Sequence, residues 1–306
     1  MTVGDFKRYF VQHFLSYDMA ERTSILSIIM EETLGMNQVE AILYHDQEIT
    51  QEKKRELQRV CQELSKDIPI QYIYQKAHFL GLSLYVDSRV LIPRQETEEL
   101  VDWIVTTHMA VPQLRILDIG TGSGAIAIAL KKHLPQASLT AIDISEGALA
   151  VAQQNAKRHG VAITFLQQDI LGVEDLGTSY DIIVSNPPYV RELEKKEMHA
   201  NVLDYEPSLA LFVPDDNPLL FYEEIAEIAA QNLTEGGALY FEINQYLGKQ
   251  TLEMLHKKGF KALLRKDLIP TSSSTVEDKM VLIKSESGIE NSVFDIGDQC
   301  RKHLSV

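Results

Sequence analysis

The chain has 306 residues, of which 45% are hydrophobic and 24% are charged. This length exceeds what one ordinary hydrophobic core needs and favours a large domain joined to a small one. Acidic residues outnumber basic ones by 44 to 29, giving a formal net charge of -15 that argues against binding duplex DNA through a basic surface. We therefore expect a protein or a small molecule as substrate.

Cysteine usage and hydropathy indicate the cytoplasm. Cys61 and Cys300 are far apart in the sequence, and we expect both to be free thiols. The spacing of Cys and His residues resembles no metal site, so we expect no metal. Residues 1–16 lack the apolar core of a signal peptide, and no apolar run approaches the ~20 residues that span a bilayer. We expect a cytoplasmic protein without a membrane partner.

The first 68 residues predict a small bundle of helices. Asp18 and Thr50 are candidate N-caps. Apolar residues recur with helical spacing in the first and last of the predicted helices: Phe6, Tyr9, Phe10 and Phe14, then Leu57, Val60, Cys61 and Leu64. These residues suit a core and carry no catalytic signature. The bundle is either a folded appendage or the part that holds a macromolecular substrate.

Residues 69–93 predict a β-hairpin linker. Pro69 ends the helical region, and turn residues then separate three short β-like runs, at 70–74, 79–86 and 89–92. A helix is expected next, from about residue 97 to residue 107.

Residues 94–284 predict the large domain, in which strand-like and helical patterns alternate. The strand-like runs lie at 114–119, 138–142, 162–167, 180–185 and 238–243, with two more near Lys261 and Met280. Helical patterns fill the gaps at 125–132, 146–159, 219–233 and 246–257. Such alternation predicts an α/β fold with a doubly wound parallel sheet, and ligands bind such sheets beyond the carboxyl ends of the strands. Residues 285–306 predict a loosely held or disordered tail.

A glycine-rich loop, Gly120-Thr121-Gly122-Ser123-Gly124, follows the first strand. Its glycines let the backbone approach a ligand closely, and the next helix directs free N–H groups toward that ligand. Asp143, at the end of the second strand, is placed to accept from both hydroxyls of a ribose. Asp169 and Ile170, after the third strand, are placed to cover an adenine ring. The sequence therefore predicts an adenosine-type cofactor.

The loop alone leaves the identity of this cofactor open. Gly120, Gly122 and Ala125 also match the dinucleotide pattern GxGxxG/A. Asp118, just before the loop, favours S-adenosylmethionine, because a carboxylate attracts an amino-acid ammonium and repels a pyrophosphate.

The tetrapeptide Asn186-Pro187-Pro188-Tyr189 follows the strand-like run at 180–185 and suits a planar amide or an adenine amino group. Such a nitrogen is a poor nucleophile until two acceptors hold its N–H bonds. The side-chain oxygen of Asn186 and the carbonyl of Pro187 are candidate acceptors, and the two prolines stiffen the loop. Tyr189 can stack on the acceptor. The sulfonium is already a strong electrophile, so alignment rather than a general base drives the transfer.

The chain resembles the release factor glutamine N5-methyltransferases, the HemK/PrmC family, from about residue 20 to residue 284. Besides the tetrapeptide, the resemblance rests on these stretches: Pro69 to Ile73, Val90 to Arg94 with Thr97-Glu98, Ile116 to Gly124, and Tyr205-Glu206-Pro207 with Ala210-Leu211. Where the family usually has proline after Arg94, this chain has Gln95.

The resemblance implies a Rossmann-like class I methyltransferase domain that transfers a methyl group from S-adenosylmethionine, leaving S-adenosylhomocysteine. The implied acceptor is the glutamine of the Gly-Gly-Gln motif in class I peptide chain release factors, gripped in part by the N-terminal bundle. The implied cofactor residues are Gly120 to Gly124, Asp143, Ile170 and Asn186. Asn186 to Tyr189 would bind the glutamine, with Arg94 at the edge of the substrate site.

Three alternatives stay open. The substrate could instead be a ribosomal-protein glutamine. Nucleic-acid amino-methyltransferases share the Asn-Pro-Pro-Tyr tetrapeptide, although the acidic charge balance argues against direct DNA binding. A cofactor-binding scaffold without catalysis is the third. The polar segment 191–204 is either a surface excursion or a lid over the substrate.

Overall fold

The computed structural model describes residues 1–198, 200–266 and 278–284. The expected tail at 285–306 and the second cysteine, Cys300, lie outside the described residues.

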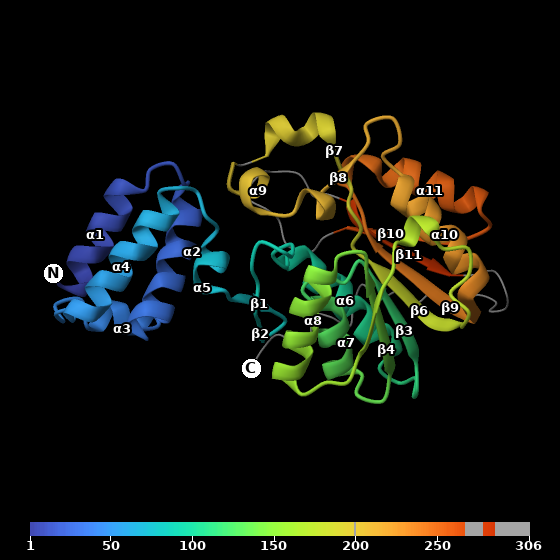
Figure 1. Cartoon of the computed structure of the whole chain (residues 1–306), viewed down its shortest axis with the longest axis horizontal. Coiled ribbons are helices and arrows are strands. Elements are labelled where there is room, and N and C mark those ends of the chain that lie inside the picture. The colour runs from blue at the N-terminus through green and yellow to red at the C-terminus, as the bar shows by residue number, and fades with distance from the viewer. Residues whose placement is uncertain (199, 267–277, 285–306) are drawn as a thin grey trace.

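The N-terminal part is a bundle of short helices, seen at the left of Figure 1. In chain order these are α1 (Val3–His13), α2 (Met19–Ile29) with a π-helical turn (Met30–Leu34), α3 (Gln38–Leu43), α4 (Gln51–Leu64) and α5 (Ile70–Tyr74). The predicted caps are present, because the side chains of Asp18 and Thr50 accept hydrogen bonds from the first turns of α2 and α4. Phe6, Phe10 and Leu57 lie in the buried core of this bundle.

The linker differs from the three strands expected for it. Residues 70–74 form α5, because Ile70 and Ile73, three apart, both pack into the core of the bundle. Tertiary packing thus overrides the β propensity of this run. A short hairpin does follow, formed by β1 (Ala77–Phe79) and β2 (Leu82–Leu84). The run at 89–92 is not a strand, because Asp87 turns the chain by accepting a hydrogen bond from the Arg89 amide.

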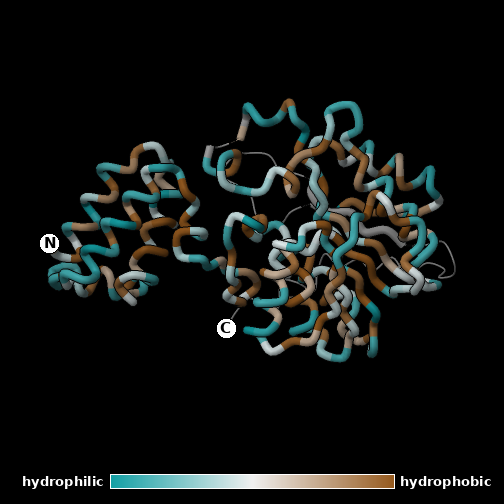
Figure 2. Tube along the Cα trace, in the orientation of Figure 1, coloured by the Kyte–Doolittle hydropathy of each residue, from teal (hydrophilic) through white to brown (hydrophobic). Residues whose placement is uncertain are grey.

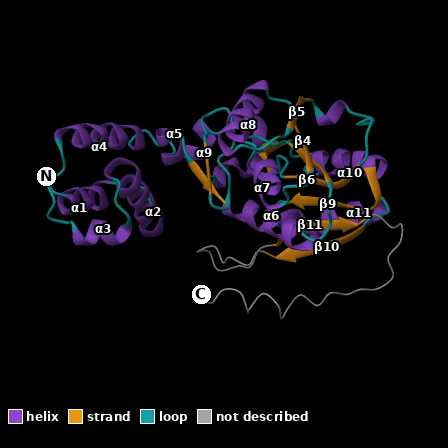
Figure 3. Ribbon diagram, turned by 90° about the horizontal axis from the view of Figure 1, so that it is seen from below, coloured by secondary structure: helices purple, strands orange, loops and turns teal. Residues whose placement is uncertain are grey.

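A seven-stranded sheet forms the centre of the large domain (Figure 3). Its strand order is β10 (Lys261–Lys266), β11 (Asp278–Lys284), β9 (Leu233–Glu242), β6 (Tyr180–Ser185), β3 (Arg115–Ile119), β4 (Ser138–Asp143), β5 (Thr164–Gln167). The strands from β9 to β5 pair in parallel, as predicted. The two late strands predicted near Lys261 and Met280 are β10 and β11, and β11 is antiparallel to both of its neighbours. The connection from β10 to β11 is too short for the crossover that parallel strands require.

Helices cover both faces of the sheet, as Figure 1 shows. One face packs against α6 (Gln95–His108), α7 (Ala125–His133) and α8 (Glu146–His159), through a core that includes Leu100, Ile128 and Ala156. The other face packs against α10 (Leu220–Asn232) and α11 (Gly248–Lys257), through a core that includes Tyr222 and Leu255. Figure 2 shows hydrophobic residues along the strands and hydrophilic residues on the outer turns.

The chain order creates a switch point between β3 and β6. The chain runs from β3 outward to β4 and β5, then returns to form β6 on the other side of β3. The loops after β3 and β6 therefore leave the sheet at the same edge and diverge, which opens a crevice between them. Both sequence motifs lie in these two loops.

An excursion follows β6 and crosses toward the bundle. It comprises β7 (Val190–Arg191), a 3-10 turn (Glu192–Glu197), α9 (Ala200–Tyr205), a second 3-10 turn (Ser208–Ala210) and β8 (Phe212–Val213). The Tyr205 hydroxyl donates to the Lys66 carbonyl at 2.7 Å, so α9 contacts the end of the bundle, beside which it lies in Figure 1. None of the described helices has the length and apolarity needed to cross a membrane.

Replacing Phe10 with Ala should lower the free energy of unfolding of the bundle by about 3–5 kcal/mol, because it leaves a cavity. Phe10 is fully buried, whereas the adjacent Tyr9 is 44% exposed. Tyr9→Ala is therefore the matched control, with an expected change under about 1 kcal/mol. Urea denaturation followed by circular dichroism measures both. Equal losses in the two variants would contradict this account of the core.

Candidate active site

A cavity of about 370 Å³ lies at the carboxyl edge of the sheet, at the switch point between β3 and β6. Six of the sequence-predicted cofactor residues line it: Gly120, Gly122, Asp143, Asp169, Ile170 and Asn186. Pro187 and Pro188 of the tetrapeptide line the same cavity. The fold therefore brings the glycine-rich loop and the tetrapeptide, 62 residues apart from Gly124 to Asn186, to one site.

The glycine-rich loop bends around the end of β3. Gly120 and Gly122 have positive φ angles of 72° and 54°, a region that side chains disfavour. A Cβ atom built on either glycine would meet no protein atom within 4 Å, although both glycines line the cavity. The backbone thus leaves open space where a ligand can approach it closely.

The other three loop residues serve the structure behind the cavity and do not line it. The Thr121 hydroxyl donates to Asp118, and the Ser123 carbonyl accepts from Asn155 at 2.9 Å. A Cβ on Gly124 would lie 3.1 Å from the Cβ of Ala152, so glycine is required where α7 crosses α8.

Asp118 is fully buried beneath this loop. Its Oδ2 accepts from the Thr121 hydroxyl at 2.7 Å and from the Ala127 amide at 3.2 Å. Its Oδ1 is buried without a hydrogen-bond partner in the described part of the chain. Burial raises the pKa of Asp118 to about 7, hydrogen bonds from Thr121 and Ala127 oppose this rise, and the charge of Asp143 adds to it.

Asp143 holds the loop from the side of β4. Its Oδ2 accepts from the Gly122 amide and its Oδ1 from the Ser145 amide, both at 2.9 Å. Burial raises the pKa of Asp143, although the backbone hydrogen bonds oppose this rise. Each carboxylate oxygen keeps a lone pair beyond these bonds, so the side chain can still accept from hydroxyl groups in the cavity.

Asn186 enters the site from β6 and is partly buried. Its side-chain Nδ2 donates to the Thr97 hydroxyl at 3.2 Å, and Thr97 donates in turn to Glu242 at 2.6 Å. Tyr189 does not line the cavity, because its ring packs against the core under α10. Its hydroxyl donates to Glu242 at 3.2 Å. The predicted stacking of Tyr189 on the acceptor therefore stays a prediction.

Arg94 also lies outside the cavity lining. Its guanidinium forms an ion pair of 2.6 Å with the Glu206 carboxylate, which is buried and also accepts from the Ile92 amide. This contact fixes the excursion after β6 to the linker. The next residues of the excursion, Pro207, Leu209 and Ala210, line the cavity. The described residues of the 191–204 segment are not in the lining, although residues that follow this segment are.

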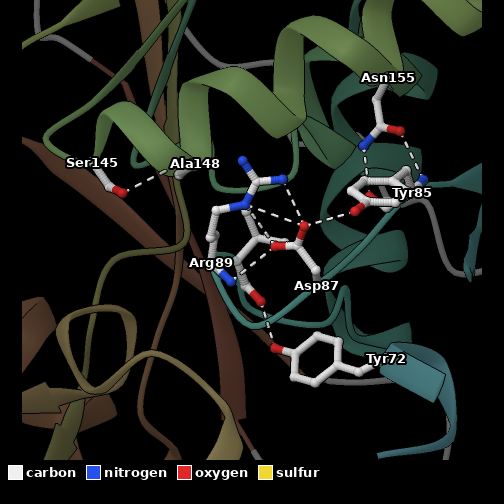
Figure 4. Close-up of polar contacts among 8 residues, drawn as sticks. Tyr72, Tyr85, Asp87, Arg89, Ser145, Ala148 and Asn155 are labelled. Carbon is white, nitrogen blue, oxygen red and sulfur yellow. Dashed lines mark hydrogen bonds and ion pairs between the residues drawn. The ribbon is translucent and has the colours of Figure 1, made fainter. Parts of the chain in front are cut away.

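The linker contributes a wall that sequence reasoning missed. Arg89, Val90 and Leu91 line the cavity, and Figure 4 shows how this turn is held. The Arg89 guanidinium pairs with Asp87 at 2.6 Å, and the Tyr72 hydroxyl donates to the Val90 carbonyl at 2.6 Å. The sequence predicts a hairpin strand at 89–92, and a hairpin strand gives no reason to expect these residues in a cavity wall.

Asn155 joins this linker to the glycine-rich loop. Its Oδ1 accepts from the Tyr85 amide at 2.7 Å, and its Nδ2 donates to the carbonyls of Tyr85 and Ser123 at 2.9 Å. Figure 4 shows the pair Asn155 and Tyr85 between α8 and the linker. The sequence shows only that Asn155 is a polar residue within the predicted helix 146–159, and it does not reveal the hydrogen-bond partners of its side chain.

Comparison with known proteins identifies the family. The chain is 50% identical to the release factor glutamine methyltransferase of Flavobacterium psychrophilum, over 88% of this chain and 96% of that protein. It is 48% identical to that of Bacteroides thetaiotaomicron, over 80% and 88% of the two chains. This chain belongs to the release factor glutamine methyltransferases. Family models agree: the PrmC N-terminal domain matches residues 11–74 and the Methyltransferase small domain matches residues 98–204.

Membership in this family agrees with the observed fold, a class I S-adenosylmethionine-dependent methyltransferase domain behind a helical N-terminal domain. Among solved structures, the hMettl16 catalytic domain in complex with the MAT2A 3′UTR hairpin 6 is similar, with a TM-score of 0.53 and 15% identity. The match covers 80% of this chain and 84% of that one. At this identity the likeness shows the fold alone.

The structure also explains where this chain departs from the family pattern. Gln95 is the first residue of α6, and Arg94 is its N-cap. Proline is favoured at this first helical position, because its missing N–H has no partner within the helix. Gln95 therefore occupies a place that either residue can fill without disturbing Thr97. Among the described residues, no group of three or more His, Cys, Asp or Glu could hold a metal ion.

Asp118→Asn should change how stability depends on pH. Folding raises the pKa of Asp118 from 3.8 to about 7, so its contribution is present below pH 3.8 and is lost as the pH rises through 7. From pH 5 to pH 8 the wild type should therefore lose about 1–3 kcal/mol of unfolding free energy relative to the variant.

Urea denaturation of both proteins at pH 5 and pH 8 measures this difference. Asp181→Asn is the control: burial opposes the shift, but hydrogen bonds from Arg115 and Thr234 hold the pKa of Asp181 below its ordinary value. Its stability contribution is therefore already complete at pH 5. Parallel pH curves for the wild type and Asp118→Asn would contradict the burial argument.

Proposed function

We propose that this protein transfers a methyl group from S-adenosylmethionine to a release factor. The acceptor is the side-chain amide N5 of the glutamine in the Gly-Gly-Gln motif of class I peptide chain release factors. One observation carries the proposal: the glycine-rich loop and Asn186 line one cavity, in a chain 50% identical to a protein named release factor glutamine methyltransferase. Because such a substrate acts in translation, the proposal places the protein in the cytoplasm.

The residues of the cavity fit S-adenosylmethionine. Its methionine ammonium suits the end of β3, where Asp118 lies two residues before the cavity-lining Gly120 and has a buried oxygen without a hydrogen-bond partner among the described residues. A pyrophosphate would meet repulsion from the same carboxylate, which disfavours a dinucleotide. Asp143 has lone pairs for the ribose hydroxyls, while Ile170 offers an apolar surface for the adenine. When bound, the cofactor supplies an electrophilic methyl group on a sulfonium.

The residues of this chain would then prepare the acceptor nitrogen. A glutamine amide delocalises its lone pair into the carbonyl, so it attacks a methyl group only when its two N–H bonds are held. Oδ1 of Asn186 and the Pro187 carbonyl are the two acceptors in this proposal. Both residues line the cavity, and Pro188 keeps the loop stiff. Alignment of this kind contributes about 7–11 kcal/mol in well-oriented systems.

The parts outside the cavity suit a protein substrate. The excursion after β6 contributes Pro207, Leu209 and Ala210 to the cavity and contacts the bundle through Tyr205 and Lys66. The excursion therefore connects the cavity lining to the end of the bundle. We propose that this surface receives the release factor, with Arg94 holding the excursion through Glu206.

The proposed function and its ribosomal-protein and nucleic-acid alternatives differ in the molecule that receives the methyl group. We would incubate the protein with labelled S-adenosylmethionine and, separately, a purified release factor, ribosomal proteins or DNA. Mass spectrometry then locates the methyl group. The expected result is one methyl on the glutamine of the Gly-Gly-Gln motif, absent when that glutamine is replaced by Glu. Label on DNA alone, or on ribosomal protein alone, would overturn the proposal. So would cofactor binding without transfer, as a scaffold would show.

Asn186→Ala tests the role of the tetrapeptide. Affinity for the cofactor should stay within about tenfold, while turnover should fall below detection, because the acceptor amide loses one of its two hydrogen-bond acceptors. Calorimetry and the methyl-transfer assay measure the two effects. Asn232→Ala removes a buried asparagine at the end of α10 instead, and this control should keep the wild-type turnover. Near wild-type turnover in Asn186→Ala would contradict the proposal that Asn186 accepts a hydrogen bond from the substrate amide.

A further inference from the structure

A chain of three side chains runs from the sheet to the tetrapeptide. Glu242 ends β9, Thr97 lies in the first turn of α6, and Asn186 follows β6. The Thr97 hydroxyl donates to Oε2 of Glu242 at 2.6 Å, and Nδ2 of Asn186 donates to the Thr97 hydroxyl at 3.2 Å. Glu242 is 1% exposed and Thr97 is 4% exposed, so water does not compete for these bonds.

The order of donors in this chain follows from the chemistry of its members. A carboxylate only accepts, and the threonine hydroxyl has a single proton. The short bond commits that proton to Glu242, since bonds to a charged acceptor are the stronger ones. The hydroxyl oxygen of Thr97 is then an acceptor toward Asn186. The amide of Asn186 must therefore turn its nitrogen, and not its oxygen, to Thr97.

We infer that Glu242 and Thr97 are positioning residues that direct Oδ1 of Asn186 toward the acceptor glutamine. This inference rests on the proposed function. An asparagine amide rotated by half a turn would present its own N–H bonds to the N–H bonds of the substrate. That arrangement opposes two donors and leaves the acceptor nitrogen without a partner. The chain Glu242–Thr97–Asn186 excludes the rotated state.

Glu242 also holds the other end of the tetrapeptide. Its Oε1 accepts from the Tyr189 hydroxyl at 3.2 Å. Burial and the charge of Glu242 raise the pKa of Tyr189 well above its ordinary value, so the hydroxyl keeps its proton and remains a donor. Asn244, two residues beyond Glu242, donates to the Tyr189 carbonyl at 3.0 Å. The end of β9 and the residues just after it thus hold Tyr189 directly and Asn186 through Thr97.

The sheet itself sets this arrangement. β6 and β9 are parallel neighbours, and Ser185 pairs with Phe241. Asn186 and Glu242 each follow one of these paired residues, so they leave the sheet at the same level. The gap between their side chains is then filled by Thr97 from α6, which packs on this face of the sheet.

Thr97→Val removes the hydroxyl but keeps the shape of the side chain. We expect kcat to fall about 10²-fold, as for other small losses of alignment at a reacting group. The Kd for S-adenosylmethionine and the KM for the release factor should stay within about threefold. Thr97→Ser should restore kcat to within about threefold of the wild type, because the serine hydroxyl rebuilds the relay.

Thr251→Val is the matched control. Thr251 of α11 is also buried, and its hydroxyl donates at 2.9 Å to the carbonyl of Leu247, the residue that precedes α11. It should lose stability without losing kcat. A wild-type kcat in Thr97→Val, or an equal loss in Thr97→Ser and Thr97→Val, would overturn the inference. If Thr97→Val does not fold, Glu242→Gln takes its place. Thr97 and Tyr189 donate to different oxygens of Glu242, and glutamine replaces one of these oxygens with an NH2 donor, so kcat should fall at unchanged cofactor affinity.

A readout without substrate separates this inference from the proposed function. In protein labelled with ¹⁵N-asparagine, the side-chain amide signal of Asn186 is assigned by its loss in Asn186→Asp. Its protons should exchange with water more slowly in the wild type than in Thr97→Val. Equal exchange would overturn the relay even if the release factor is methylated. Slow exchange with no methyl transfer by the wild type would overturn the proposed function alone.

Discussion

The parallel pairing of β3 with β6 is the constraint on which the site depends. Ile119 pairs with Ser185 across these strands, so Gly120 and Asn186 begin their loops at the same level of the sheet. The two loops diverge because the strands that follow β3 are added on one side of it, whereas β6 and β9 lie on its other side. The result is a cavity lined on one side by the backbone of the glycine-rich loop and on the other by the tetrapeptide.

Acidic side chains at strand ends make this edge of the sheet rigid. Asp118 holds Thr121 and Ala127, Asp143 holds Gly122 and Ser145, and Glu242 holds Thr97 and Tyr189. A buried carboxylate is unfavourable unless donors surround it, so each acid requires its loop to take one conformation. Burial raises the pKa of Asp118, and its Oδ1 has no hydrogen-bond partner among the described residues. The packing that shapes the loops thus leaves one oxygen of Asp118 without a partner at the end of β3.

The linker and the excursion complete the site from outside the sheet. The turn at Arg89 and Leu91 forms one wall, and Pro207 to Ala210 form another. Arg94 and Glu206 join the two walls, while Asn155 joins the linker to the glycine-rich loop. The bundle continues directly into this linker, and its end at Lys66 contacts Tyr205 of the excursion. A substrate held by the bundle would therefore be presented to the tetrapeptide.

The sequence by itself determined the periodic features of this protein. Strand 180–185 and helix 146–159 have the predicted bounds. A buried strand and an amphipathic helix each have a characteristic spacing of apolar residues, and this spacing is visible in the sequence. The two loop motifs were visible for the same reason: Gly120 to Gly124 and Asn186 to Tyr189 carry their chemistry within a few adjacent residues. Their meeting at one cavity followed from the rule for parallel sheets.

Only the tertiary structure decided what depends on distant partners. Ile70 and Ile73 form a helix because the bundle buries them, against their β propensity. β11 lies between β10 and β9, a position in the sheet that its own residues do not specify. Thr97 and Glu242 look like a helix-start threonine and a strand-end acid, yet they are 145 residues apart and hydrogen-bonded. Local order along a chain cannot encode which buried donor will meet which buried acceptor, because that choice is made when the helices and the sheet pack together.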